Sequence, residues 1–506
     1  MPSPGPFRLS KSKFTAGVQC LKRLYLQVHQ PELAGEIDDE QEARLEEGQE
    51  VGRLAQKAFP RGVLVDSGPL ELDAALRSTA ALADNPSVPA IFEATFQRFD
   101  VLVRVDILER LRRNRWRLIE VKSSVELKEH HVYDVAIQHC VLSGCGLDLA
   151  CAGVMHLNRN YIYGGASYDP HELFAIEDVT RSVRKLGDDV PKLLRRQRKV
   201  LAQIHPPSIA AGPQCCDPYV CEFFSHCNPD PPENHISFLP RLSEKKKQNL
   251  LELGRDLIRD IPEDFPLTEI QNRVTEAVRT GHAWTSNILA KELRRLKYPM
   301  YFMDFETLYP AIPRHAGMWP YSHIPFQWSL HRRLEPDAPL EHFEFLADDA
   351  LDRRREFIDS LCCVLGRHGP IVVYNASFES QRLHDLSGWL PKYGNRVGNI
   401  QSRLWDLFPF VKQHVYHPEF QGSYSLKTVL PALVPESSYD HLDVTNGGEA
   451  GLVWDRMIRG GVDAQERQRL KSALRAYCRQ DSFALVKVLD RLNTLASRTR
   501  ARGGTV

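Results

Sequence analysis

The alternation of apolar and polar positions predicts an α/β region in the first half of the chain. β-rich runs over residues 101–108 and 116–122 predict two strands, and the arginine-rich residues 112–115 between them predict a hairpin turn. A helix over residues 131–142 and a strand over residues 151–158 follow. Strands that alternate with helices are typical of a mixed α/β domain.

A second α/β region is predicted towards the end of the sequence. Residues 297–307 have the pattern of a buried strand, and two further strands are predicted at residues 343–346 and 371–374 with a helix between them. A helix from about residue 465 to residue 492 carries an apolar stripe at helical spacing. The fold class predicted for the whole chain is therefore α/β.

A proline-rich stretch at residues 228–233 separates the two regions. The residues after it are polar with helical spacing and suggest no chemistry. We therefore predict a first domain at residues 1–232, a helical connector at 233–297, a second domain at 298–495 and a disordered tail at 496–506.

Composition narrows the class of protein. Lys+Arg and Asp+Glu both number 65, so a nucleic-acid partner would have to be held by local basic patches. The absence of an apolar run of about 18 residues predicts no membrane span, and the first residues lack the apolar core of a signal peptide. We expect a cytoplasmic protein, in which eleven cysteines indicate metal binding or free thiols more than disulfides.

The predicted hairpin places charged groups on one face. A turn centred on Arg113 puts Asp106 directly opposite Glu120, and Lys122 lies on the same face as Glu120. Two like charges placed opposite destabilise a hairpin unless a cation neutralises them. A divalent cation would do so, with Lys122 next to an attacking hydroxide or a phosphate oxygen. The alternative is an exposed hairpin face with an ordinary Glu–Lys pair.

These residues resemble the PD-(D/E)XK nucleases, in particular their RecB-like branch. Asp106 and the Glu120-Val-Lys122 core match, and Gln138 matches the first residue of the branch's Gln-x-x-x-Tyr motif, although Leu142 replaces the tyrosine. The resemblance implies a restriction-endonuclease-like core in which Asp106 and Glu120 bind Mg²⁺ or Mn²⁺. Glu93 is a further acid upstream.

Four cysteines, Cys215, Cys216, Cys221 and Cys227, fall within thirteen residues. Thiolates are soft ligands that suit iron–sulfur clusters or zinc. The resemblance implies a 4Fe-4S cluster held by one early and three late cysteines, here Cys20, Cys216, Cys221 and Cys227. Zinc is the alternative, and the sequence does not decide between Cys215 and Cys216.

The second region contains two candidate acid pairs. Asp304 and Glu306 lie two apart and point to one face of a strand, where a cation would relieve their repulsion. Tyr477 and Asp481 lie four apart on the apolar face of the long helix, where a buried aspartate needs a cation or a hydrogen-bond partner. The alternatives are a strand that ends in solvent and an aspartate at the margin of the stripe.

Together these pieces resemble the DnaQ-like DEDD exonucleases of the ribonuclease H superfamily. The resemblance implies a mixed sheet flanked by helices, four acids that hold two Mg²⁺ or Mn²⁺ ions, and a tyrosine that orients the attacking water. Most relatives have aspartate at the second motif, where this chain has glutamate. Asp406 is a reserve ligand, and Lys427 could contact a phosphate. The matching residues are Asp304, Glu306, Asn375, Phe378, Glu379, Tyr477 and Asp481.

The combined expectation is a nuclease with two catalytic modules that acts on nucleic acid, with DNA favoured over RNA, in repair, recombination or defence. The chain as a whole resembles an uncharacterised bacterial family that fuses these two modules. One alternative is a nucleic-acid-binding protein with one or both centres inactive, motivated by Glu379 and Leu142. Another is a zinc-stapled interaction protein without nucleic acid.

Overall fold

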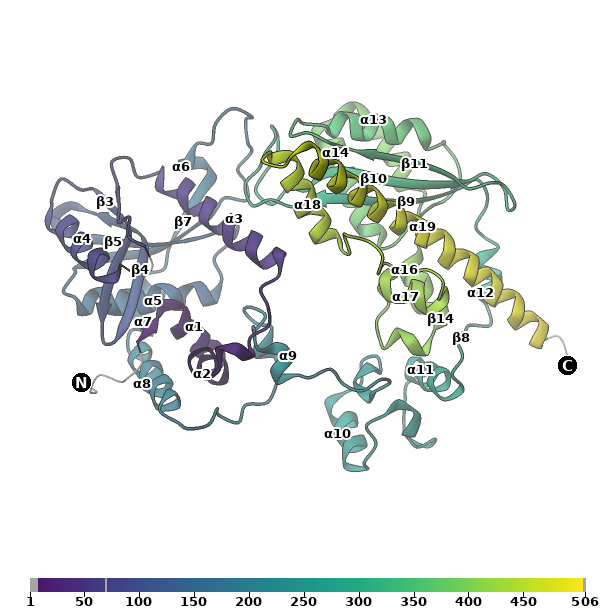
Figure 1. The fold of residues 1–506 in the computed structure, drawn as a ribbon, viewed down its shortest axis with the longest axis horizontal. Helices are drawn as coiled ribbons and strands as arrows, with labels where there is room; N and C mark the ends of the chain where they lie inside the picture. The colour runs from purple at the N-terminus through teal and green to yellow at the C-terminus, as the bar shows by residue number, and fades with distance from the viewer. Residues whose placement is uncertain (1–7, 69–70, 504–506) are drawn as a thin grey trace. The chain divides into compact units, whose positions relative to one another are not determined.

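The computed structural model describes residues 8–68 and 71–503, which fold as two α/β units (Figure 1). The predicted fold class is thereby confirmed. The first unit contains the chain up to Asp230 together with Pro310–Ser322, and the second contains Pro231–Tyr309 and the chain from His323 onwards. Residues 233–297, expected to form a connector, belong to the second unit. Their helices are α10 (Glu244–Glu252), α11 (Glu269–Thr280) and α12 (Leu289–Leu293).

A mixed sheet forms the frame of the first unit. Its strands follow the order β2-β3-β4-β5-β6-β7, with β1 paired to β4. The β3–β4–β5 meander is antiparallel, β6 is parallel to β5, and helix α5 (Glu129–Gly144) connects those two strands. The strands are β1 (Leu9–Ser10), β2 (Val63–Leu64), β3 (Ala90–Arg98), β4 (Val101–Arg110), β5 (Trp116–Lys122), β6 (Leu149–Leu157) and β7 (Phe174–Asp178).

Helices cover this sheet. The apolar side of α5 packs on β4 and β5 through residues such as Val135 and Val141. Two helices follow one another near the N-terminus, because Cys20 is extended and ends α1 before α2 begins. The remaining helices of the first unit, labelled in Figure 1, are α1 (Lys11–Gln19), α2 (Leu21–His29), α3 (Asp39–Gln56), α4 (Leu72–Asp84), α6 (Pro170–Leu173), α7 (Thr180–Leu186), α8 (Asp189–Leu201) and α9 (Phe224–Cys227).

The β4–β5 hairpin has the register that a turn centred on Arg113 gives. Pairs run from Arg110 opposite Trp116 to Ile107 opposite Ile119. Arg113 adopts a left-handed conformation with φ of 62° at the turn. The ladder between the two strands ends one residue before Asp106 and Glu120.

The second unit has a five-stranded mixed sheet in the order β11-β10-β9-β12-β13. The strands β9, β10 and β11 are antiparallel, whereas β12 runs parallel to β9 and β13 runs parallel to β12. A separate two-stranded sheet pairs β8 with β14. The bounds are β8 (Trp284–Thr285), β9 (Met300–Leu308), β10 (Ile324–Arg333), β11 (Glu341–Leu346), β12 (Ile371–Val373), β13 (Leu404–Asp406) and β14 (Val415–Tyr416).

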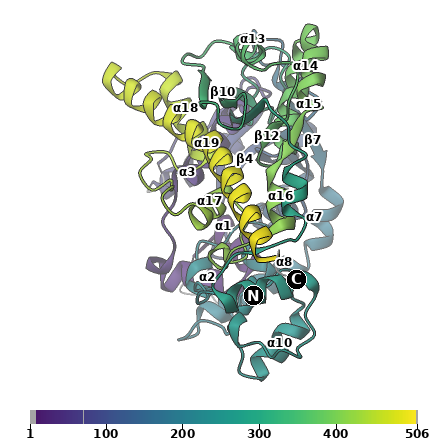
Figure 2. The same cartoon turned by 90° about the vertical axis from the view of Figure 1, so that its right-hand side faces the viewer.

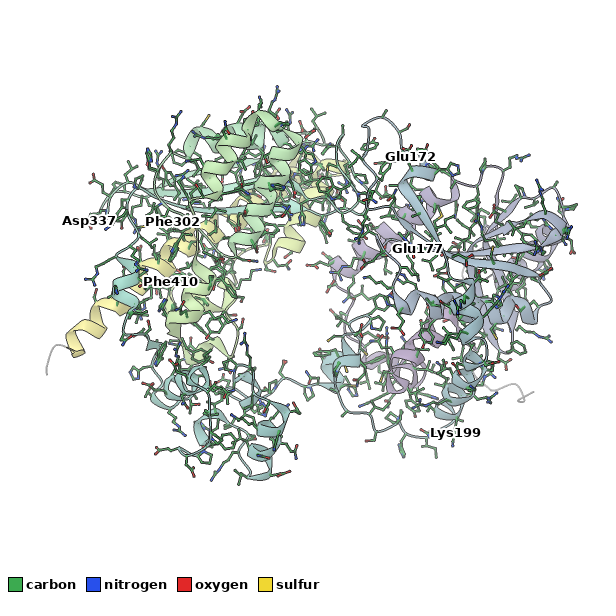
Figure 3. The ribbon with its side chains drawn as sticks, turned by 180° about the vertical axis from the view of Figure 1, so that it is seen from behind. Glu172, Glu177, Lys199, Phe302, Asp337 and Phe410 are labelled. Carbon is green, nitrogen blue, oxygen red and sulfur yellow. The ribbon has the colours of Figure 1, made fainter. Side chains whose placement is uncertain are left out.

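The two faces of the five-stranded sheet meet different helices. On one face, Met303 and Phe305 of β9 pack against residues of α13, α14 and α15. The other face carries Phe302, which is labelled in Figure 3, and Asp304. This face is turned towards the long helix α19, which is yellow in Figures 1 and 2. The helices of this unit are α13 (Arg354–Val364), α14 (Ala376–Trp389), α15 (Gly394–Gln401), α16 (Leu407–His414), α17 (Leu426–Leu433), α18 (Gly447–Arg459) and α19 (Ala464–Gly503).

The C-terminal helix is longer than predicted. Helix α19 runs to Gly503, so residues 496–503 are helical where the sequence predicted disorder, and residues 504–506 lie outside the described part. Among the described helices, none is both long enough and apolar enough to cross a membrane.

Candidate active sites

Glu120 is the centre of a polar cluster in the first unit. Its side chain is 2% exposed, and both carboxylate oxygens accept hydrogen bonds from Lys11 Nζ, at 2.8 and 2.9 Å. Lys122 Nζ lies 2.9 Å from Oε1, and Gln138 Nε2 donates to Oε2 over 2.6 Å. The structure therefore brings Glu120, Lys122 and Gln138 together as the sequence predicted, and it adds Lys11.

Asp106 reaches the same cluster by a different contact than expected. Because the strand pairing stops at Ile107, the Asp106 carboxylate accepts a hydrogen bond of 2.6 Å from the backbone N–H of Val121. Burial, followed by repulsion from Glu120, raises the pKa of Asp106 to about 7. Glu93, which sits in a left-handed conformation in β3, adds to this repulsion. Asp106 is therefore the acid of this cluster that titrates near neutral pH.

The two lysines hold Glu120 in its charged form. Burial alone would raise the pKa of Glu120, but Lys11 and then Lys122 lower it below the usual range. Burial alone would lower the pKa values of both lysines, but Glu120 acting together with Asp106 on Lys11, and with Asp134 on Lys122, raises both pKa values. The charge of Glu120 is thus already balanced by protein cations.

Sequence reasoning missed Lys11 and Asp134. Asp134 accepts a hydrogen bond of 2.5 Å from Lys122 Nζ and fixes that side chain. It lies one helical turn before Gln138 on α5, a spacing that could have identified it. No local signal identifies Lys11, because 109 positions separate it from Glu120.

Gln138 and Leu142 are both buried inside the first unit. Gln138 is fully buried and also donates to the carbonyl of Asp134 over 2.9 Å, while its own Oε1 has no hydrogen-bond partner in the described structure. Leu142 is fully buried in the core of the first unit. Gln138 therefore orients Glu120, and position 142 is not available to contact a ligand.

A cleft of about 390 Å³ opens beside Asp134. Its walls include the rings of His130, Tyr133 and Tyr219 and the side chain of Arg23. The His130 and Tyr219 rings meet edge to face with centroids 5.0 Å apart, and Tyr219 is half exposed. The cleft therefore offers aromatic surfaces and the Arg23 cation beside Asp134, the residue that holds Lys122.

Four cysteines of the first unit gather around a small cavity. Cys20, Cys215, Cys221 and Cys227 line it, together with apolar residues such as Leu26 and Phe223. Cys216 is exposed and does not line it, so Cys215 takes the place that was assigned to Cys216. The reason is local: the short 3-10 helix Pro213–Cys215 ends at Cys215, and Cys221 N–H donates to its carbonyl over 2.8 Å, which ties that residue to the cavity.

The four thiols fit a soft metal group. No three of these sulfurs lie within 4.8 Å of one another, whereas tetrahedral zinc with Zn–S bonds near 2.3 Å holds sulfurs about 3.8 Å apart. The donor set suits either a zinc ion or an iron–sulfur cluster.

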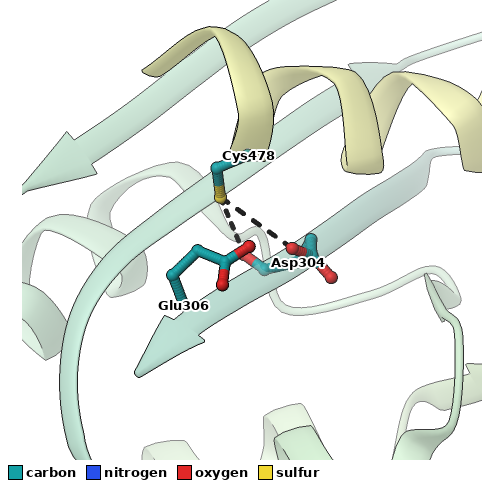
Figure 4. Close-up of side chains that lie close together, drawn as sticks. All are labelled: Asp304, Glu306 and Cys478. Carbon is teal, nitrogen blue, oxygen red and sulfur yellow. Dashed lines mark hydrogen bonds between the residues drawn. The ribbon is translucent and has the colours of Figure 1, made fainter. Parts of the chain in front are cut away.

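In the second unit, two acids and a thiol meet at one point (Figure 4). Asp304 and Glu306 project from β9 towards Cys478 of α19. Among the described residues, these three form the only group of His, Cys, Asp or Glu side chains whose ligand atoms all lie within 4.8 Å of one another. The Cys478 sulfur lies 3.9 Å from Asp304 Oδ2.

Asp481 lies one turn further along α19 and is 9% exposed. Its Oδ1 accepts a hydrogen bond of 2.6 Å from the hydroxyl of Tyr439, a residue that sequence reasoning missed. The buried Tyr477 also hydrogen-bonds to Asp481. The amine of Lys427 lies 5.5 Å from the centre of the Tyr477 ring and attracts both Glu306 and Asp481.

Glu379, from the first turn of α14, is the fourth acid. It is 2% exposed, and its Oε2 has no hydrogen-bond partner in the described structure. Asp406, the reserve ligand, is occupied differently: its carboxylate accepts from the backbone N–H groups of Asn375, Ala376 and Phe408. Asp406 therefore fixes the start of α14 and caps α16.

The acids of the second unit repel one another. Burial, then repulsion from Asp481, raises the pKa of Asp304 well above its usual range, and the same two causes raise that of Glu306. Burial raises the pKa of Glu379 to about 8, and Glu379 in turn contributes to the shifts of Asp304 and Glu306. Four acids grouped in this way, with one nearby lysine, are a candidate site for divalent cations.

Comparison with known proteins yields no established function. Residues 301–425 match a family described as a domain of unknown function, DUF2779. The chain is similar to the uncharacterized protein UU173 of Ureaplasma parvum serovar 3, with 28% identity over 217 residues, which is 38% of this chain and 31% of the relative. The chain thus spans about a third of that relative. No solved structure matches significantly. The matched family segment begins at β9 and therefore contains Asp304, Glu306 and Glu379.

Proposed function

We propose that the protein is a metal-dependent nuclease with two catalytic modules that hydrolyse phosphodiester bonds in nucleic acid, DNA more than RNA. The observation that carries the proposal is the convergence of Asp304, Glu306 and Asp481, with Glu379 beside them, on one buried point of the second unit. Such a set is costly without cations. The sheet order, with β9 at the centre, agrees with the resemblance to DEDD exonucleases.

In the second unit, the four acids would hold two Mg²⁺ or Mn²⁺ ions. Bound there, the ions supply a nucleophile at neutral pH and charge stabilisation for the leaving oxygen. Tyr477 would orient the attacking water from the side of Asp481, and Tyr439 holds the Asp481 carboxylate in place. Lys427 would meet a phosphate oxygen at the edge of the acid group.

In the first unit, Asp106 and Glu120 would bind the cation and Lys122 would stand beside the nucleophile. Asp134 holds the Lys122 amine, and Gln138 holds the Glu120 carboxylate. The cleft beside Asp134 suits an unpaired base, because aromatic rings stack on bases of any sequence. These contacts support a role on single-stranded ends.

The cysteine cavity would hold a 4Fe-4S cluster, with zinc as the alternative. Cluster ligands at Cys20 and Cys227 would close a chain loop of about 200 residues and stabilise the fold of the first unit. We expect anaerobically purified protein to be brown and to lose its colour and iron in Cys221→Ser. The exposed Cys216→Ser is the matched control and should keep both. A colourless protein with stoichiometric zinc would favour the alternative.

The nuclease proposal is tested by cleavage of labelled single- and double-stranded DNA and RNA in Mn²⁺. Asp304→Asn and Glu120→Gln remove one charge from each centre with little change in shape. Asp490→Asn, on α19, and Glu109→Gln, on β4, are matched controls whose partners are Arg333 and Arg117. We expect at least a hundredfold loss in the module that carries the activity. Full activity in the Asp304→Asn, Glu120→Gln double variant would overturn the proposal.

One observation favours a second candidate for the first unit, a nucleic-acid-binding module without cleavage. Lys11 contacts both oxygens of Glu120, where a cation would bind. If Lys11 keeps that place, Asp304→Asn alone abolishes all cleavage, and salt-dependent binding to the first unit remains.

A further inference from the structure

Cys478 stands where a metal ligand would stand, and neither resemblance assigns it a role. Its sulfur is fully buried and faces Asp304 and Glu306 across the space between β9 and α19 (Figure 4). The contacts from the sulfur to Asp304 are long, 3.9 Å to Oδ2 and 4.0 Å to the backbone carbonyl. These weak contacts do not explain a thiol placed among acids.

The spacing suits a shared ion. A tetrahedral cation with a sulfur at about 2.3 Å and an oxygen at about 2.1 Å separates those two atoms by about 3.6 Å. The observed separation from Asp304 Oδ2 is 3.9 Å, and the Glu306 oxygen falls within the same 4.8 Å group. Sulfur and both carboxylates therefore come within reach of one ion after a small side-chain adjustment.

A second, independent feature points to a ligand at this place. Glu379 comes from a different element, is 2% exposed, and has one carboxylate oxygen without a hydrogen-bond partner in the described structure. Its charge acts on both Asp304 and Glu306, so it lies near the same centre. A buried carboxylate oxygen left without a partner is expensive unless a cation or water satisfies it.

We propose that Cys478 is a metal ligand of the second unit and that it makes this centre prefer thiophilic divalent cations, such as Co²⁺ or Zn²⁺, over Mg²⁺. The inference rests on the proposed metal centre and names the class of ion that the centre selects. Binding replaces the thiol S–H bond by a sulfur–metal bond, and the proton leaves to solvent. Thiolates favour zinc and its neighbours, whereas carboxylates alone suit magnesium.

The test uses the full-length protein freed of divalent metal and titrated with Co²⁺. Sulfur–cobalt coordination gives a charge-transfer absorption band, and the difference between wild type and Cys478→Ser removes the contribution of the cysteines in the first unit. Cys363→Ser, an exposed cysteine of the same unit, is the matched control. We expect the band to be lost only in the Cys478 variant, with Co²⁺ affinity reduced about tenfold or more and Mg²⁺ affinity changed less than threefold.

Further variants distinguish a failure of the proposed metal centre from a failure of the proposed role of Cys478. Asp304→Asn should weaken Co²⁺ and Mg²⁺ binding alike, and if it weakens neither, the metal centre itself is wrong. If Asp304→Asn weakens both while Cys478→Ser leaves the Co²⁺ affinity and the spectrum unchanged, only the role of Cys478 is overturned. Cys478→Ala and thermal melting of each variant guard against unfolding. Equal loss of both metals in the serine and alanine variants would also overturn the selectivity.

Discussion

At the scale of single residues, the acids of the second unit are a source of instability when no metal is bound. Asp304 is half-buried beside Asp481 and Glu306, and its charged form is disfavoured. Functional sites commonly contain destabilising groups of this kind. Replacing such a group stabilises the protein and abolishes its activity. This instability is therefore measurable independently of any cleavage assay.

We predict that Asp304→Asn raises the melting temperature of the metal-free protein and removes the further rise that Mn²⁺ produces. An amide cannot carry the charge that its neighbours repel, and each kcal/mol gained shifts melting by about 2–4 °C in a domain of this size. Differential scanning calorimetry measures both effects. Asp490→Asn should retain the Mn²⁺ effect, since its carboxylate pairs with Arg333. A lower melting temperature in Asp304→Asn would contradict this source of instability.

Lys11 gives a second prediction at this scale. Because its amine contacts both oxygens of Glu120, Lys11→Gln should increase the Mn²⁺ affinity of the first unit severalfold. Calorimetric titration in an Asp304→Asn background confines the measurement to that unit. Lys13→Gln, two positions along α1, is the control and should change nothing. Unchanged affinity in Lys11→Gln would mean that the lysine does not compete with the metal.

The sequence indicated which acids share a face, but it did not indicate their partners. Asp304 and Glu306 were identifiable because strand geometry alone places residues two apart on one face. Lys11, Tyr439 and Cys478 reach their sites only through tertiary packing, over separations that no local pattern records. The choice between Cys215 and Cys216 was equally beyond the sequence, because it depends on which thiol the loop turns inwards.

At the scale of elements, the register of the β4–β5 hairpin was predictable, whereas β10, an inner strand of the five-stranded sheet, was not. A turn centred on Arg113 fixes the β4–β5 pairing, as the structure shows. Strand β10 was missed because most of its residues are buried on both faces, so it lacks the alternation that marks a half-buried strand. Pro325, next to a register shift, obscures the pattern further.

The packing of α19 on β10 predicts the acid sensitivity of the second unit. His331 Nδ1 lies 2.9 Å from Ser482 Oγ of α19. The His342 ring of β11 lies tilted beside the His331 ring, with centroids 4.6 Å apart. Burial, with repulsion from His342 and from Arg479 of α19, lowers the pKa of His331 to about 3. The unfolded chain, with a histidine pKa near 6.5, then binds more protons than the folded protein.

Stability from His331 is therefore fully present above pH 6.5 and is lost as the pH falls towards 3. The loss is about 2 kcal/mol at pH 5. We predict that His331→Asn, which can keep a hydrogen bond to Ser482, flattens the decline in the free energy of unfolding between pH 7 and pH 5. Urea denaturation at several pH values measures this slope. His384→Asn, an exposed histidine of α14, should leave the slope as it is in the wild type.

At the scale of the whole molecule, the sequence predicted two α/β regions but not which residues belong to each. Pro310–Ser322 lies in the sequence between β9 and β10, both in the second unit, yet it belongs to the first unit. Its anchoring is specific: Gly317 N–H donates to the carbonyl of Tyr163, and Tyr163 N–H donates to that of Met318, both over 2.8 Å. No periodic pattern in the sequence indicates that this segment belongs to the first unit, because the segment contains no helix or strand.

Because Pro310–Ser322 belongs to the first unit, a substitution in this segment should destabilise the first unit. Ile312 is buried among residues of the first unit, in one cluster with Ile107, Ile119 and Met155. Removing a buried isoleucine side chain down to alanine costs about 2–5 kcal/mol. In the full-length protein, Ile312→Ala should therefore increase hydrogen exchange in β3, β4 and β5 of the first unit while β9 and β10 keep their protection.

Leu334→Ala, in the exposed connection between β10 and β11, is the matched control and should change neither unit. Faster exchange confined to β9 and β10 in Ile312→Ala would mean that the segment supports the strands it connects. Protection lost only in the first unit would show that the chain must cross between the units twice before the first one is complete. In that case, a cut after Asp230 would deprive the first unit of part of its own core.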